Sequence, residues 1–113
     1  MRKGKWGRLV SISWDKAATP SALPYDYGVG KAARDVLANK LARQERAHGI
    51  TVNTVAPGPV AYPTDAESKE FVHKGKAWPA RKGPTNQDVA ETVAWLCSEE
   101  ARFVTGSRIE LPG

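Results

Sequence analysis

A tyrosine and a lysine stand four residues apart in the segment Tyr27-Gly28-Val29-Gly30-Lys31. Residues at positions i and i+4 share one face of a helix. A free tyrosine loses its proton only near pH ~10, and a neighbouring positive charge favours the ionised phenolate. A phenol beside an ammonium group is therefore a candidate acid–base pair. The same spacing also fits two surface residues of an amphipathic helix, so the elements around the pair must decide between the two interpretations.

The pair stands at the head of a long helix. We predict this helix over residues 27–47, because apolar residues recur there at helical spacing. These residues are Ala33, Val36, Leu37 and Leu41. Gly49 follows and fits a helix C-cap. The helix therefore has an apolar side that needs a neighbour.

Short strands flank this helix and a second one. We predict strands over residues 8–13, 50–55 and 108–111 from their β-branched and apolar character. A second helix begins at the capping segment 85–88 and carries Val89, Val93, Leu96 and Cys97 on one side, where we expect Cys97 to be buried. Segment 60–84 is rich in proline and glycine, with room for a short helix over residues 65–74. The alternation of strands and helices predicts an α/β fold with right-handed crossovers and a parallel sheet of about three strands.

Composition sets outer bounds on the protein class. At 113 residues the chain is expected to be a single domain, residues 1–113. One cysteine allows no internal disulfide, and no apolar run approaches the ~20 residues of a membrane span, so we expect a cytoplasmic protein. The net charge is +5, but the basic residues are spread over several elements, which disfavours nucleic-acid binding. His73 has no partner at metal-ligand spacing, and no metal site is predicted.

The order of these segments resembles the C-terminal half of the short-chain dehydrogenase/reductase family, in particular its 3-oxoacyl-carrier-protein-reductase-like members. The matching segments run in the family's order: Gly7-Arg8-Leu9-Val10-Ser11-Ile12-Ser13, Tyr27-x-x-x-Lys31-Ala32-Ala33, Gly49-Ile50-Thr51-Val52-Asn53-Thr54-Val55-Ala56-Pro57-Gly58, Asp88-Val89-Ala90, Trp95-Leu96 and Thr105-Gly106-Ser107-Arg108-Ile109. The resemblance implies a partial Rossmann-like sheet that lacks the N-terminal βαβ units.

The resemblance also implies an NAD(P)-dependent oxidoreductase that reduces carbonyls or oxidises alcohols. Tyr27 would be the general acid at the substrate oxygen, and Lys31 would make that tyrosine a stronger acid and hydrogen-bond the nicotinamide ribose. A serine after the first strand would orient the carbonyl. The residues implied to contact the cofactor are Tyr27, Lys31, Pro57, Gly58, Val60 and Thr64.

Two positions depart from the family's spacing. The family's serine precedes the tyrosine by thirteen residues, which leads to Trp14, so that either Ser13 fills the role after a one-residue insertion or tryptophan has replaced the serine. Likewise, the threonine expected five residues after Pro57 falls on Tyr62, with Thr64 two residues further on.

The glycine-rich dinucleotide fingerprint of the family belongs to its N-terminal half, which this chain does not contain. Residues 28–33 fit G-x-G-x-x-A formally, but no strand runs directly into them and no acidic residue ends a second strand ~20 residues later. Hence NAD cannot be told from NADP, and cofactor binding by this chain alone is in question. We expect a truncated or split enzyme acting on a small-molecule substrate, either as a homo-oligomer or with a complementary N-terminal half. The alternative is a non-catalytic remnant that self-associates, and a dimer is expected in both cases.

Overall fold

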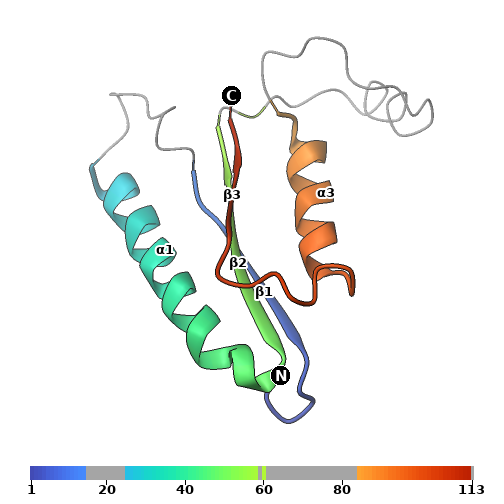
Figure 1. Ribbon diagram of the computed structural model, residues 1–113. Helices are drawn as coiled ribbons and strands as arrows, with labels where there is room; N and C mark the ends of the chain where they lie inside the picture. Colours follow the sequence, from blue (N-terminus) through green and yellow to red (C-terminus); the bar gives the residue numbers. More distant parts are fainter. Residues whose placement is uncertain (15–24, 59, 61–83, 113) are drawn as a thin grey trace, which may run out of the picture.

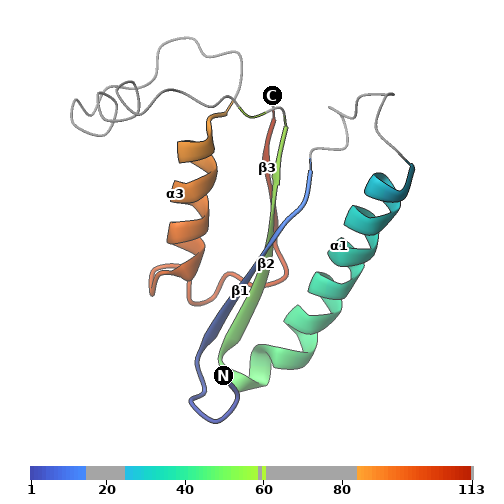
Figure 2. The ribbon, with the colours of Figure 1, turned by 180° about the vertical axis from the view of Figure 1, so that it is seen from behind.

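The computed structural model describes residues 1–14, 25–58, 60 and 84–112. Within them, three strands form one sheet in the order β1-β2-β3. The strands are β1 (Gly7–Ile12), β2 (Ile50–Pro57) and β3 (Arg108–Leu111). Helix α1 covers one face of this sheet and helix α3 covers the other, as the two opposite views show (Figures 1 and 2). The predicted short helix over residues 65–74 lies outside the described residues.

Both strand pairs are parallel, so the predicted α/β fold with a three-stranded parallel sheet is confirmed. Gly7 stands opposite Ile50 and Ile12 opposite Val55, and on the other side of β2 Thr54 stands opposite Arg108. Every residue of β2 from Ile50 to Ala56 is buried, as expected for the central strand of a sheet covered on both faces. The carboxyl ends of all three strands therefore meet at one edge of the sheet.

Helix α1 spans Tyr25–Glu45 and begins two residues earlier than the spacing predicted. Its contact with the sheet is made by small side chains: Ala38 and Ala42 form a core cluster with Ile50 and Val52, and Leu41 packs against it. The larger apolar residues face outward, since Val36 is 71% and Leu37 55% exposed. The helix thus has a thin inner stripe toward the sheet and a separate outer apolar side without a cover in the described part of the chain.

A short 3-10 helix, η2 (Arg46–His48), connects α1 to β2 through Gly49. Gly49 caps it with φ of 70°, in the left-handed region, and donates its N–H to the carbonyl of Arg46. A Cβ at this position would overlap the carbonyl oxygen of Lys5. The predicted glycine C-cap is confirmed, and both its conformation and its close approach to the N-terminal segment require glycine.

Helix α3 spans Asn86–Cys97 and begins at the capping segment that the sequence predicted. The Thr85 hydroxyl accepts the backbone N–H of Asp88, and the Asp88 carboxylate accepts the backbone N–H of Thr85, which completes a capping box. Leu96 is fully buried against the sheet. The prediction for Cys97 was wrong: it is exposed, because it is the last residue of the helix and lies beyond the buried stripe.

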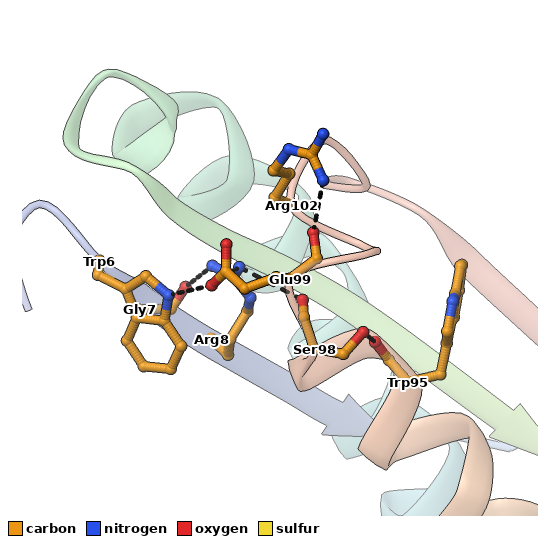
Figure 3. A network of polar contacts seen from close by, with 7 residues as sticks. All are labelled: Trp6, Gly7, Arg8, Trp95, Ser98, Glu99 and Arg102. Atoms are coloured by element: carbon orange, nitrogen blue, oxygen red, sulfur yellow. Dashed lines mark hydrogen bonds and ion pairs between the residues drawn. The ribbon is translucent and has the colours of Figure 1, made fainter.

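The end of α3 is tied to the start of β1 by a polar network (Figure 3). The indole Nε1 of Trp6 donates to Glu99, and the Arg8 guanidinium stacks 4.8 Å from the centre of the Trp6 ring. Arg8 also donates to the carbonyl of Ser98, which follows the helix. A cation at a helix C-terminus is stabilising, because it interacts with the partial negative charge of the last carbonyl groups. This network fixes α3 on the face of the sheet opposite α1.

None of the helices in the described part of the chain is both long and apolar enough to cross a membrane.

Candidate active site

Tyr27 and Lys31 lie on one face of the first two turns of α1. The Lys31 ammonium is 5.6 Å from the centre of the Tyr27 ring. It also donates a hydrogen bond of 3.0 Å to the carbonyl of Ile12, the last residue of β1. That bond holds the lysine between the helix and the sheet. Tyr27 as a whole residue remains 42% exposed.

This pair stands at the edge where the parallel strands end. The first turn of α1 lies beside the carboxyl end of β1, at the same end of the molecule as the ends of β2 and β3 (Figure 1). Ligands of open α/β sheets bind beyond the carboxyl ends of the strands. The pair therefore lies at the edge of the sheet where folds of this kind bind their ligands.

Trp14 contacts the tyrosine directly. Its ring meets the Tyr27 ring edge-to-face, with the centroids 5.3 Å apart and an interplanar angle of 75°. The indole also lies against Gly28, where an added Cβ would come within 3.4 Å of Trp14 Cζ2. The residue thirteen positions before the tyrosine thus presents an aromatic ring to it.

Ser13 is buried next to Trp14. Its backbone N–H donates to the carbonyl of Val55, which continues the pairing of β1 with β2 by one residue. Its hydroxyl accepts a hydrogen bond of 3.3 Å from Arg108. Within the described residues, no hydrogen bond joins the Ser13 hydroxyl to Tyr27.

The other predicted cofactor contacts lie at the end of β2. Pro57 is the last residue of that strand, and the Gly58 N–H donates to the carbonyl of Leu111 at the end of β3. Pro57, Gly58 and Val60 are half-buried. Thr64 lies outside the described residues. The structure therefore brings Tyr27, Lys31 and the turn after β2 to one edge of the sheet.

Sequence reasoning missed two charged residues beside this site. Arg108 and Asp35 form an ion pair of 2.8 Å between β3 and α1, and Arg108 also donates to the Ser13 hydroxyl. Each stood in a segment that was assigned as a strand or a helix from its apolar residues. The only available signal was their opposite charge in elements that flank the same strand, which is a weak indication of contact.

Comparisons with known proteins find similar sequences along the whole chain. The family model described as Enoyl-(Acyl carrier protein) reductase matches residues 1–113. The chain is 36% identical over its whole length to 46% of an A-factor type gamma-butyrolactone 1'-reductase of Streptomyces virginiae. It is 30% identical, again over its whole length, to 47% of a 3-oxoacyl-(acyl-carrier-protein) reductase of Pseudomonas aeruginosa.

A solved structure shows the same fold. The structure of a short-chain type dehydrogenase/reductase from Mycobacterium ulcerans superposes with a TM-score of 0.73 at 29% identity, covering 100% of this chain and 42% of the other. The chain therefore spans about half the length of the proteins it matches.

Proposed function

The chain belongs to the short-chain dehydrogenase/reductase family, and from that premise we propose that it carries the tyrosine–lysine half of an NAD(P)-dependent oxidoreductase. The substrate class is a small carbonyl compound or the corresponding alcohol. Two relatives of this chain are named as reductases, one of an A-factor type gamma-butyrolactone and one of a 3-oxoacyl-(acyl-carrier-protein). Residues 1–113 would form one unit, the C-terminal half of the family's fold.

The observation that carries this proposal is the placement of Lys31. Its ammonium stands beside the Tyr27 ring and is held by the carbonyl of Ile12. A general acid must be held within reach of the atom that it protonates, and the anchored ammonium keeps a positive charge next to the phenol ring. Tyr27 would give its proton to the carbonyl oxygen during reduction and accept a proton from the alcohol during oxidation.

The described residues fit the nicotinamide end of a dinucleotide. Lys31 has three N–H donors, of which one is used by Ile12, so two can bind a ribose hydroxyl. Pro57, Gly58 and Val60 would form the turn against the nicotinamide ring, with Thr64 as a further proposed contact. A bound NAD(P) would supply or accept the hydride.

Ser13 is the residue that we propose to orient the substrate carbonyl. It lies on the same face of the sheet as α1, one residue past the end of β1. Because Trp14 occupies the family's serine spacing, a Ser13→Ala substitution decides whether the hydroxyl takes part.

Titration of the chain with NADH and NADPH tests the proposal, with nicotinamide fluorescence and calorimetry as the readouts. We expect binding of at least one of the two, and loss of turnover with retained binding in Tyr27→Phe. If neither cofactor binds, this chain alone is not the cofactor-binding oxidoreductase. The titration should then be repeated with a complementary N-terminal half of a relative added in equal amount, because a split enzyme would bind only in that mixture.

A second candidate is a non-catalytic module that associates with itself. Two observations favour it: β1 has a strand on one side only within the described sheet, and the outer side of α1 exposes large apolar residues. These residues are Tyr25, Val29, Val36 and Leu37. Unpaired strand edges and exposed apolar patches both promote association.

Sedimentation of the chain and of a Val36→Glu, Leu37→Glu variant tests this candidate. We expect a dimer or larger assembly for the unchanged chain and a monomer for the variant, because a charge cannot be buried cheaply in an apolar contact. A matched control places glutamates on α3 instead, at the exposed Ala90 and Ala94. A monomer at every concentration would contradict the self-associating module.

A further inference from the structure

We infer that Arg108 is a positioning residue for the Tyr27 site: it holds Ser13 and Trp14 at the end of β1 in the orientation in which they face α1. This inference rests on the proposed function, because the catalytic roles of Tyr27 and Ser13 come from it. The contacts themselves are independent of that function.

The Arg108 guanidinium joins three elements. Its Nη2 donates a bond of 2.6 Å to the carbonyl of Trp14, and its Nη1 donates to the Ser13 hydroxyl at 3.3 Å and to Asp35 Oδ2 at 2.8 Å. Its Nε binds Glu110 at 2.6 Å. Arg108 begins β3, so one planar group ties β3 to the end of β1 and to the middle of α1.

The location of the guanidinium makes these bonds effective. The Arg108 side chain is 27% exposed and that of Asp35 18%, so both charges are largely removed from water. Hydrogen bonds to ionised groups are about twice as strong as neutral ones and have narrower geometry. Removing one partner of such a pair leaves the other charge buried without compensation. The bonds of Arg108 therefore hold β3, the end of β1 and α1 in a fixed relative position.

The hydrogen bond from Arg108 determines whether the Ser13 hydroxyl can act as a donor. A serine oxygen accepts with its lone pairs and donates one hydrogen. Because Arg108 has no acceptor, the bond occupies an acceptor position on Oγ and leaves the hydroxyl hydrogen free to donate. A substrate carbonyl needs such a donor. Arg108 thus holds Ser13 in the state that the proposed orienting role requires.

The contact with Trp14 acts on the tyrosine. Residue 14 lies beyond the paired part of β1, and Arg108 binds its carbonyl. The Trp14 ring in turn meets the Tyr27 ring edge-to-face. Losing the Arg108 bond should let the backbone at residue 14 rotate, which would move the indole away from the phenol.

Nuclear magnetic resonance of the chain with labelled tyrosine rings tests this role directly. Tyr27→Phe assigns the Tyr27 signals, and Trp14→Leu shows how far they move when the indole ring current is lost. We expect Arg108→Gln to move the Tyr27 signals by at least half of that shift, in the same direction. Tyr27 signals that stay at their original positions in Arg108→Gln, while Trp14→Leu moves them, would overturn the inference.

Two further variants guard against a general structural effect. Arg102→Gln removes an exposed guanidinium that donates to the Glu99 carbonyl and lies 5.3 Å from the centre of the Phe103 ring, and it should leave the Tyr27 signals unchanged. Arg108→Lys keeps the charge without the planar fork and should recover part of the shift. If Arg108→Gln does not fold, Asp35→Asn takes its place, and an unchanged Tyr27 signal in both Asp35→Asn and Arg108→Lys overturns the inference.

If the chain is active, its turnover tests whether the position of Tyr27 affects catalysis. A misplacement near 1 Å can cost on the order of 100-fold in rate, so we expect Arg108→Gln to lower kcat by about 10–100-fold and to change KM less. An inactive chain would contradict the proposed function alone, because the tyrosine signals still decide whether Arg108 positions the site. A normal kcat in Arg108→Gln with shifted Tyr27 signals would overturn the link to catalysis.

Discussion

The ammonium of Lys31 reaches two groups at once, the Tyr27 ring one helical turn away and the carbonyl of Ile12 at the end of β1. The bond to Ile12 decides the geometry, because an unattached lysine on a helix surface would point into water. Since the lysine is anchored to the sheet, its charge stays beside the phenol. The fold therefore fixes the distance between the ammonium and the phenol ring, which would vary if both side chains were free on the surface.

Replacing Tyr27 by phenylalanine should abolish proton transfer and leave the fold intact. A positioned general acid contributes about 100- to 10,000-fold to a rate, so turnover should fall by that factor while cofactor binding remains. Tyr25→Phe is the matched control, because Tyr25 is on the same helix and 94% exposed. Equal turnover in the two variants would contradict the role of Tyr27.

Replacing Lys31 by methionine should lower both turnover and stability. The variant loses the charge beside Tyr27 and leaves the Ile12 carbonyl without its donor. A hydrogen bond from a charged group contributes about 1.5 kcal/mol at the low end, which suits a half-exposed side chain. Urea unfolding and turnover are the measurements. Lys40→Met changes an exposed position on the same helix and should alter neither turnover nor stability. An equal loss in the two variants would show that the effect comes from the net charge of the helix and not from the contacts of Lys31.

The sequence predicted the elements that have strong local signals. The three strands, the glycine cap at Gly49 and the Thr85 capping box follow from periodicity and cap chemistry, both of which act over a few residues. The proximity of Tyr27 and Lys31 also follows from local helix geometry.

Contacts between distant segments could not be predicted in the same way. Arg108 and Asp35 are 73 residues apart in the chain, and Trp14 meets Tyr27 across residues 15–24. Their contact depends on how the strands and α1 pack, and no local pattern records this. The apolar periodicity of α1 also did not indicate which residues meet the sheet, because the sheet accepts the small Ala38 and Ala42 and leaves Val36 and Leu37 outside.

Gly49→Ala should destabilise the fold. The residue has a positive φ, and an added Cβ would overlap the carbonyl of Lys5. A left-handed conformation in a residue other than glycine costs about 1–3 kcal/mol, and the overlap adds to that cost. Gly30→Ala is the control with the opposite sign, since nothing lies within 4 Å of its Cβ position and alanine favours a helix by about 0.5–1 kcal/mol. Thermal unfolding that shows the same change in both variants would contradict this account.

Stability should fall in acid because of an ion pair at the far end of α1. Arg2 donates two hydrogen bonds to the Glu45 carboxylate, one of them 2.9 Å long. The hydrogen bond from Arg2 lowers the pKa of Glu45, and burial only partly opposes it. An unfolded glutamate has a pKa near ~4.3, so in moderate acid the unfolded chain binds the proton more readily than the folded one. The pair therefore stabilises the fold fully above that value, and the contribution is lost as the pH falls through the lower pKa of the folded state.

Thermal unfolding between pH 7 and pH 3 measures this contribution in the unchanged chain and in Glu45→Gln. At neutral pH the unchanged chain should have the higher midpoint. The gap should narrow as the pH falls from ~4.3 toward the lower pKa of Glu45 in the folded state, because protonated Glu45 resembles glutamine. Glu91→Gln on the exposed side of α3 is the control, and it should follow the unchanged chain closely. A gap between the unchanged chain and Glu45→Gln that stays constant down to pH 3 would show that the packing of residue 45, and not its charge, determines the effect.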